Sequence, residues 1–478
     1  MNRTLIAIAL SVLAWSAIFG SLPTPAMASF QIESVVSDTI DAGDNSALVI
    51  DANGDPHLVF TEGAGDLKYA RKTGAAWSFE NIDVGVFGDG AALALGATGE
   101  PHVVYHQGSN LRVARRVGGV WTSYLVDSNV SITQVADIAI NSQGQDVVVY
   151  KRGDGELIAA TQDTGPAGGW VYSIVDTSVF DSANGLPSLA IDANDIVHVS
   201  YAGEVGYLQY AKGSGCGTPA TCSWSIEIVD PSLYVNSLEA RTSIAVDPAG
   251  NPHIAYGNLS RKLSFAKKQG GLWSLSVVDT SSGAGARYAS LALDSQDLPR
   301  ITARQSSGSP TGLKYAVQAM PGGPWTIALV DTGATKGYYS SLALDANDVA
   351  HVSYAISNGG ATFDMRYAVE AVGTSVESGP RVDPAPSALL LRNVPNPFSP
   401  RTTIRYEIAV VQPVSIEIYD VAGRRVRSLL SEPAAGVGRR EVEWDGRADN
   451  GDLLPSGVYV YSLRGEGGVR MRRMTLVR

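Results

Sequence analysis

The chain has 478 residues, of which 45% are hydrophobic and 17% charged, and its net charge is −11. A chain of this length can bury a large core. Its acidic balance argues against nucleic-acid binding, because the phosphate backbone requires a basic protein face.

The first 28 residues have the features of an export signal. Arg3 gives a positive start, Leu5–Leu22 is mostly apolar, and Ala26–Ala28 is a small-x-small cleavage site. Pro23 and Pro25 interrupt the segment before the next strand and argue against a retained anchor. No later segment is apolar enough to span a bilayer. We therefore predict an exported protein with no transmembrane segment in the mature chain.

Residues 29–372 contain seven copies of one pattern. The copy from Ser188 reads SLAIDANDIVHVSY, followed by LQYAK and then WSIEIVD, which gives four short strand-like runs. The copies are aligned by one position in the second run, occupied by His57, His102, Val147, His198, His253, Arg300 and His351. These positions are 45–55 residues apart. This period predicts an all-β, seven-bladed β-propeller with four strands per blade.

The two ends of the repeat array predict how the ring closes. The seventh copy has no Trp-containing fourth run, but Phe30–Val36 matches that run closely. We therefore expect Phe30–Val36 to pair with the strand around Met365–Ala368. This pairing supplies the missing strand of the last blade and removes an open sheet edge.

Two cysteines lie in one insertion of the fourth copy. Cys216 and Cys222 are separated by five residues in a chain that we expect to be exported. A zinc site needs more ligands than two cysteines without a nearby histidine. We therefore predict a disulfide between them.

A change in composition marks a boundary after the repeats. Residues 373–390 contain Pro380, Pro384 and Pro386 and few large apolar residues, which is typical of an exposed linker. From Arg381 onward there are 15 Arg, no Lys and 11 acidic residues, so the tail is basic and the propeller region strongly acidic.

Residues 391–478 predict a second, small all-β domain. The six strand candidates are Thr403–Ile408, Val414–Tyr419, Arg425–Leu430, Arg440–Trp444, Gly457–Arg464 and Arg470–Val477. They are enough for an Ig-like β-sandwich.

Five ordered motifs in this tail carry a family resemblance. They are Val394–Pro400, Ile418–Arg424, Trp444–Gly446, Ser456–Leu463 and Met474–Arg478. Together they resemble the type IX secretion sorting domain, which is similar to the Ig-like module of the flagellar hook-capping protein. The resemblance implies the type IX secretion machinery as a partner, and a secreted or outer-surface location in a Gram-negative-type bacterium. An Ig-like spacer without a sorting role is the alternative.

The repeated histidines have one common explanation. Equivalent positions in seven blades are spread around a ring and do not converge on one ion, so we predict no metal and no cofactor. His198 recurs with Ser188, Asp192 and Trp224, which resembles the hydrogen-bonded set of WD-type propellers. We therefore expect a structural role, because buried polar groups need partners.

Binding residues are expected where the copies differ. Counted two places before the first-run serine position, the loops between blades carry Asp44, Asp89, Arg241, Tyr288 and Tyr339. Such loops lead from the outer strand to the ring axis, so we place these five side chains, exposed, at the channel mouth. Aromatic rings combined with charged groups suit a sugar or peptide ligand.

Two classes of function fit this sequence. We favour a non-catalytic extracellular binding or scaffold protein for a glycan, peptide or protein. The alternative is a secreted hydrolase or lyase acting on polysaccharide, with Asp44, Asp89 and His106 at the channel mouth. His106 is the only histidine outside the repeat position and is therefore the one candidate general base.

Overall fold

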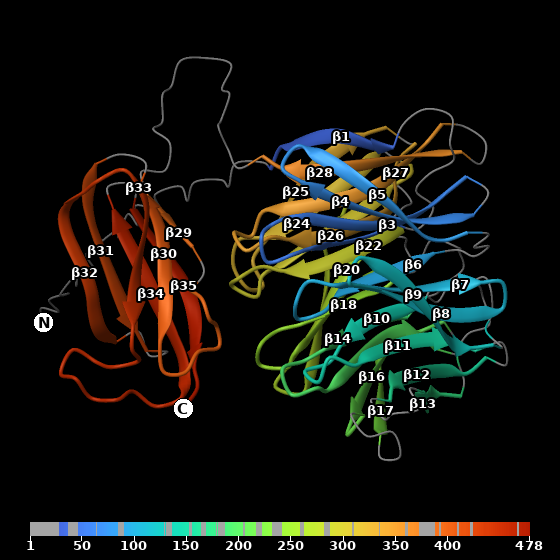
Figure 1. Ribbon diagram of the computed structural model, residues 1–478, viewed down its shortest axis with the longest axis horizontal. Helices are drawn as coiled ribbons and strands as arrows, with labels where there is room; N and C mark the ends of the chain where they lie inside the picture. Colours follow the sequence, from blue (N-terminus) through green and yellow to red (C-terminus); the bar gives the residue numbers. More distant parts are fainter. Residues whose placement is uncertain are drawn as a thin grey trace, which may run out of the picture.

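The structure, a computed structural model, is all-β. It describes residues 28–36, 46–371 and 388–478, apart from short segments at 64, 85–89, 129, 131–135, 153–154, 164–168, 178, 180–186, 204–205, 217–221, 232–240, 259–261, 282–286, 308–309, 334, 359–361, 392, 409–410, 421–423 and 466–467. The proposed signal peptide and most of the proposed linker lie outside these ranges. Figure 1 shows a ring of sheets and a separate sandwich. In the described part of the chain, no helix has the length and apolar character needed to cross a membrane.

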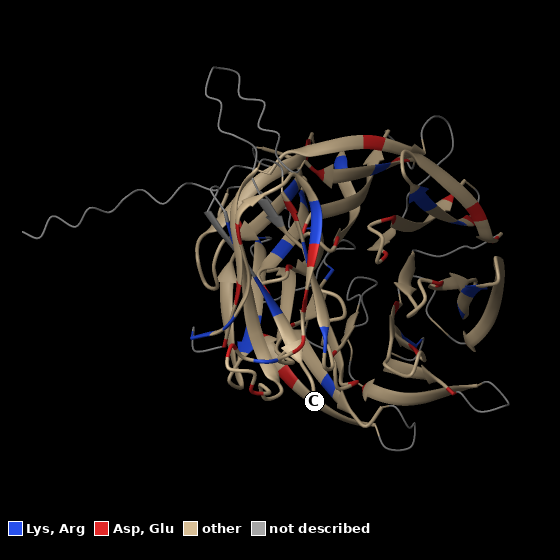
Figure 2. Ribbon diagram, turned by 60° about the vertical axis from the view of Figure 1, so that its left-hand side comes forward, with Lys and Arg blue, Asp and Glu red and all other residues tan. Residues whose placement is uncertain are grey.

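Seven antiparallel sheets of four strands form the ring (Figures 1 and 2), which confirms the predicted propeller fold. Blades one to three are β2–β5 (Ala47–Ile50, Pro56–Glu62, Asp66–Thr73, Ala76–Asp83), β6–β9 (Ala91–Leu95, Pro101–Gln107, Asn110–Val117, Val120–Asp127) and β10–β13 (Asp137–Ile140, Asp146–Lys151, Leu157–Gln162, Trp170–Asp176). Blades four and five are β14–β17 (Ser188–Ile191, Val197–Ala202, Leu208–Ser214, Ser223–Asp230) and β18–β21 (Ser243–Val246, Pro252–Gly257, Leu263–Gln269, Leu272–Val277). Blade six is β22–β25 (Arg287–Leu293, Pro299–Gln305, Gly312–Gln318, Trp325–Thr332), and blade seven combines β26–β28 (Lys336–Leu344, Ala350–Ser357, Phe363–Glu370) with β1 (Phe30–Val36).

Burial decreases from the second strand of each blade toward the outer strand. Every residue of β15 is buried, because neighbouring blades cover both faces of this strand. In the outer strand β17 of the same blade, only the last two residues, Val229 and Asp230, are buried, and the others are partly buried or exposed. The main core therefore lies between adjacent sheets, not inside any one of them.

The N-terminal strand closes the ring as predicted. Strand β1 pairs antiparallel with β28, with Phe30 opposite Glu370 and Ile32 opposite Ala368. Glu33 on β1 also accepts hydrogen bonds from Lys72 Nζ (2.5 Å) and Trp77 Nε1 (2.9 Å) of blade one. The last blade is thus bonded to the first by side chains as well as by packing.

The repeated polar residues bond in a different arrangement from the one that the WD resemblance implies. His198 contacts Asp192 (3.4 Å) and the Tyr210 hydroxyl (2.7 Å) within its blade, which gives the buried imidazole a structural role. Four tryptophans, Trp77, Trp121, Trp224 and Trp273, instead donate to the preceding blade, as Trp121 Nε1 does to Glu80 (2.8 Å). The expected single network is therefore two separate sets, one within blades and one between them.

A third set of repeated contacts links the inner strands around the axis of the ring. Ser188, Ser243, Ser290 and Ser341 on the inner strands each accept a hydrogen bond from a backbone N–H of the next inner strand, at 3.0–3.2 Å. Asp137 does the same for Leu189 N at 2.8 Å. These bonds join inner strands that have no shared sheet, and so fix the width of the channel.

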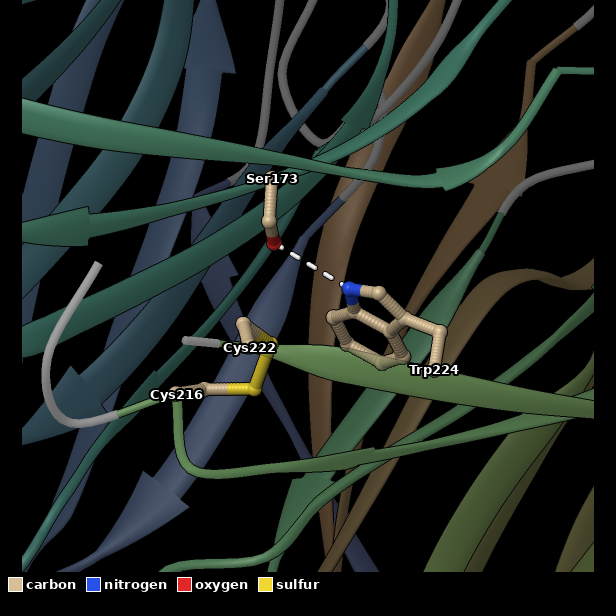
Figure 3. Close-up of a disulfide and its surroundings, with 4 residues drawn as sticks. All are labelled: Ser173, Cys216, Cys222 and Trp224. Carbon is tan, nitrogen blue, oxygen red and sulfur yellow. Dashed lines mark hydrogen bonds between the residues drawn. A yellow bond between two sulfur atoms is a disulfide. The ribbon is translucent and has the colours of Figure 1, made fainter. Parts of the chain in front are cut away.

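The predicted disulfide is present. Cys216 and Cys222 are bonded, with their Cα atoms 4.3 Å apart. Figure 3 shows the disulfide beside the Trp224 ring, whose Nε1 donates to Ser173 Oγ at 3.1 Å. A side chain at Gly213 would clash with both Trp224 and Cys216, so glycine leaves the space that this packing fills.

The C-terminal domain is a sandwich of two sheets. One sheet is β29-β30-β33 (Ala388–Leu390, Thr402–Ile408, Gly438–Trp444), and the other is β32-β31-β34-β35 (Arg425–Ala435, Gln412–Tyr419, Gly457–Gly465, Gly468–Leu476). Trp444 is fully buried between Phe398 and Tyr459. Strand β29 was not expected. It begins at Ala388, three residues before the predicted start of the domain at Leu391.

Charged residues join this domain to the propeller. Arg473 Nη2 lies 2.8 Å from Asp297 Oδ2, and Arg472 donates to Ser295 Oγ at 3.1 Å. Asp297 and Ser295 belong to the turn between the first two strands of blade six. The sandwich therefore contacts the ring face that carries the turns from first to second strands.

Candidate functional site at the channel mouth

The topology of the blades gathers particular strand ends on one face of the ring. Each blade is an antiparallel meander, so the starts of the inner and third strands meet the ends of the second and outer strands. This face is opposite the one that contacts the C-terminal domain. We call it the mouth face.

A cavity of about 130 Å³ lies at the axis on the mouth face. Its lining comes from the starts of all seven inner strands and is dominated by small residues. The charged residues among them are Asp137 and Arg241. A small polar channel of this kind admits a substituent of a ligand, not a whole polymer.

Asp137 belongs to the wall of this channel in blade three. Its Oδ2 accepts hydrogen bonds from Leu189 N and Ser188 Oγ, at 2.8 and 3.3 Å. Burial raises the pKa of Asp137, while these donors and the positive charge of Arg241 oppose the rise. Asp137 thus replaces the inner-strand serine and serves first as a link between blades.

Aromatic rings and guanidinium groups gather on the mouth face of blades five to seven. The Cζ of Arg241 lies 5.6 Å from the ring centroids of both Tyr288 and Tyr339. The two tyrosine rings are themselves 4.7 Å apart. Tyr338 and Phe363 pack edge to face beside them, at 5.2 Å. Arg304 lies over the Tyr338 ring, with its Cζ 3.6 Å from the centroid. We call these six residues and Arg287 the Arg–Tyr cluster.

Irregular backbone produces this cluster. The inner strands β22 and β26 extend over seven and nine residues, whereas those of blades one and three to five have four. Each extension carries an irregularity in pairing, between Arg287 and Ser290 in β22 and between Tyr338 and Ser341 in β26. The extra residues carry the aromatic side chains above the channel.

Two tyrosines at these irregularities adopt a left-handed backbone. The φ angles are 53° for Tyr288 and 51° for Tyr339, a conformation that costs a bulky residue on the order of 1–3 kcal/mol. Their carbonyls accept hydrogen bonds from Ser340 Oγ (2.8 Å) and Ser46 Oγ (3.3 Å) of the next blade. Strain held in this way is a feature of functional sites.

The predicted site residues fall into two groups. The structure brings Arg241, Tyr288 and Tyr339 together at the mouth face, while Asp44 and Asp89 lie outside the described residues. The expected exposure of Tyr288 is wrong, because its side chain is only 3% exposed under the neighbouring rings. Burial also raises the pKa of the Tyr288 phenol far above its usual range.

The pairing register also corrects the sequence alignment in the first blades. Ala47, not Ser46, pairs with Val59 as Ser188 pairs with Ser200, and the second blade is shifted in the same way. Asp44 and Asp89 therefore precede the serine position by three residues rather than two. They are not the equivalents of Arg241, Tyr288 and Tyr339.

His106, the candidate general base, is 1% exposed. It lies near the end of β7, opposite Leu111 in the pairing of β7 with β8. A general base must reach its substrate, and in this structure solvent barely touches the imidazole.

The five binding residues predicted from the sequence did not include Asp137, Arg287, Arg304, Tyr338 or Phe363. The signals were present for two of them. An aspartate at a serine position marks Asp137, and the replacement of a second-strand pattern in the sixth copy marks Arg304. Phe363 carries no such signal, because its place in the cluster depends on the packing of β28.

A larger cavity, of about 320 Å³, lies between the propeller and the C-terminal domain. Of its four charged lining residues, Asp297, Arg472 and Arg473 already take part in the contacts between the domains, and Asp294 bonds to Arg300 within blade six. We therefore place the candidate site at the mouth face. Among the described residues, no three His, Cys, Asp or Glu side chains converge in a way that could hold a metal ion.

Comparison with known proteins supports the two-part fold. Residues 402–468 match the family model of the FlgD Ig-like domain. No curated protein matches the sequence. A fungal alcohol oxidase of the AA5 family, solved in complex with copper, is 12% identical with a TM-score of 0.54, over 92% of this chain and 99% of that chain. At this identity the likeness concerns the fold alone.

Two further solved structures are similar over about 70% of this chain. A lectin from Burkholderia pseudomallei is 15% identical with a TM-score of 0.49, over 69% of this chain and 98% of that chain. A polysaccharide lyase of family PL25, an ulvan lyase bound to a glycan, is 12% identical with a TM-score of 0.46, over 70% of this chain and 95% of that chain.

Proposed function

We propose that this protein is an extracellular, non-catalytic carbohydrate-binding propeller whose site is the Arg–Tyr cluster at the channel mouth. The observation that carries the proposal is the strained, bulged pair Tyr288 and Tyr339 in two neighbouring blades. Tyrosine rings stack on the apolar faces of sugars, and guanidinium groups donate hydrogen bonds to sugar oxygens. Tyr338 and Tyr339 are only partly buried and so offer ring surface to a ligand.

A glycan array with the full-length protein tests this function. Tyr338→Ala and Tyr339→Ala should each weaken binding of the glycans that score by about tenfold or more, a typical effect of removing a binding aromatic residue. The matched control is Tyr124→Ala, a 45% exposed tyrosine on the outer strand β9, and it should bind as the parent does. Absence of any glycan ligand contradicts the function. Equal binding by all three variants contradicts the site.

The same experiment separates binding from catalysis. Any polysaccharide that binds should be recovered intact, with no new reducing ends and no new unsaturated sugars. Their release in amounts that grow with time, and their absence after Tyr339→Ala, would replace this proposal with the hydrolase or lyase alternative.

We further propose that the C-terminal domain directs secretion through a type IX machinery after an N-terminal signal peptide has brought the chain to the periplasm. The match to the FlgD Ig-like domain and the five tail motifs support it. Removing residues 388–478 should leave a folded propeller in the periplasm, and fusing these residues to a periplasmic reporter should carry the reporter to the surface. Surface delivery of the truncated protein contradicts a sorting role and favours the spacer.

A further inference from the structure

The Arg–Tyr cluster concentrates positive charge in a small space. Arg287 and Arg304 are direct partners in the pairing of β22 with β23, and Arg241 lies in the adjacent blade. Arg304 is 4% exposed, and Arg287 and Arg241 are partly buried. Three guanidinium groups therefore lie within one aromatic cluster, in an otherwise acidic propeller, and one of them, Arg241, lines the channel.

The pairing of Arg287 with Arg304 is electrostatically unfavourable. Like charges directly opposite each other on paired strands destabilise a sheet. Burial lowers the pKa of Arg287, and the charge of Arg304 lowers it further. An anionic group bound between them would relieve this repulsion.

The aromatic rings hold the guanidinium groups in fixed positions. Arg304 stacks on Tyr338, and Arg241 lies within cation–π distance of both Tyr288 and Tyr339. A stacked guanidinium keeps its N–H groups in the plane of its fork, where they can donate to a carboxylate or sulfate. The other charge lining the channel, Asp137, is turned to the backbone of blade four by its own hydrogen bonds.

We infer that the ligand is an acidic glycan, and that its carboxylate or sulfate group binds between Arg241, Arg287 and Arg304 while its sugar ring packs on Tyr338 and Tyr339. This inference rests on the proposed function and specifies its substrate class. It requires that the anionic group, and not the sugar ring alone, determines affinity.

Matched pairs of polymers test the inference on the full-length protein. The probes are polygalacturonic acid with its carboxyl-reduced form, and a sulfated galactan with its desulfated form. We expect at least one acidic polymer to bind about tenfold or more tightly than its neutral partner, and added salt to reduce that difference. A preference for the acidic polymer in only one of the two pairs identifies the anionic group as the carboxylate or the sulfate.

One substitution separates binding from stability. Arg287→Gln should abolish the preference for the acidic polymer yet leave the midpoint of thermal unfolding unchanged or raised, because it removes a repulsion. The control Arg116→Gln breaks the 2.7 Å ion pair with Glu80 on the outer side of the ring. It should keep the preference for the acidic polymer and lower the midpoint of thermal unfolding.

The outcomes distinguish the two proposals. Equal binding of acidic and neutral partners overturns the acidic class but leaves the carbohydrate-binding function standing. A preference that persists in Arg287→Gln also overturns this inference. Binding of none of the four polymers, nor of any glycan on the array, removes the proposed function itself.

Discussion

Buried histidines carry much of the internal polar structure of the blades. His57 lies 3.3 Å from Asp51, with the Tyr69 hydroxyl 2.5 Å away on its other nitrogen. Burial lowers the pKa of His57 and His198, although the neighbouring aspartates oppose this. Just below the unfolded histidine pKa of about 6.5, both imidazoles are therefore neutral in the folded protein, whereas in the unfolded chain they are protonated.

These shifts predict a loss of stability in mild acid. A histidine whose pKa is lower in the folded state binds more protons when unfolded, so its contribution to stability is present above the unfolded pKa of about 6.5 and is lost as the pH falls below it. Urea unfolding at about pH 8 and about pH 5 should show this fall, and His198→Gln should reduce it.

Blade six provides the control, because Arg300 occupies the histidine position and bonds to Asp294 at 3.0 Å. Arg300→Gln should lower stability equally at both pH values. An unchanged pH dependence in His198→Gln would contradict this assignment.

At the residue scale the sequence predicted roles better than partners. The recurrence of His198 with Asp192 indicated a contact between them, and the two side chains lie 3.4 Å apart. The tryptophan partner was missed, although Glu33, Glu80 and Glu227 recur at one outer-strand position and could have revealed it. That partner belongs to the neighbouring blade, and a pattern within one copy says nothing of contacts between copies.

At the scale of elements, the strands that repeat were predicted and those that depart were not. Phe30–Val36 was recognised because it repeats the fourth run of a blade. The irregular extensions of β22 and β26 were not foreseen, because the left-handed tyrosines depend on serines of adjacent blades. The sequence therefore indicated the candidate site, because the copies differ there, but it did not predict the bulges or the contacts between the aromatic rings.

Removing β1 should strongly destabilise the propeller. A chain that begins at residue 38 exposes the edge of β28 and loses the Glu33 acceptor of Lys72 and Trp77. Glu33→Ala alone should lower the free energy of unfolding by about 1–3 kcal/mol, since it removes charged and neutral hydrogen bonds together. Thermal and urea unfolding measure both effects.

The control for this strand is Ile32→Thr, at a side chain that is 43% exposed on β1. It should unfold as the parent does. A chain lacking β1 that unfolds at the parent midpoint would show that closure of the ring adds little stability.

At the scale of the whole molecule, opposite charges bring the two domains together. Asp297 has a left-handed φ of 58°, in a turn position where four other blades have glycine. In blades four and seven the corresponding Asp195 and Asp348 accept hydrogen bonds from Ser142 and Ser295 of the preceding turn. In the turn that precedes Asp297, the position equivalent to Ser142 and Ser295 is Pro248, which has no N–H to donate, and the Asp297 carboxylate pairs with Arg473.

We predict that this ion pair helps to hold the domains together. Asp297→Asn keeps a residue that tolerates the left-handed backbone but removes the charge. Combined with Arg473→Gln, it should increase the radius of gyration measured by small-angle X-ray scattering, and high salt should do the same to the parent.

The control is Arg424→Gln, which removes an ion pair inside the C-terminal domain, with Asp420. It should leave the scattering curve unchanged. Identical curves for the parent and the Asp297/Arg473 double variant would show that the pair contributes nothing to domain placement. Sequence reasoning could not predict this contact, since it joins a turn of one domain to a strand of another.

The pairing of the first strand with the last also sets the order of events during biosynthesis. Because β1 finds its partner only in β28, an emerging chain cannot close its ring until nearly all of the propeller has been made. Until then, the ends of the sheet array stay open to other partners, including a second nascent copy. A chain that completes its fold this late stays unfolded for longer, which would suit the export across a membrane that we propose above.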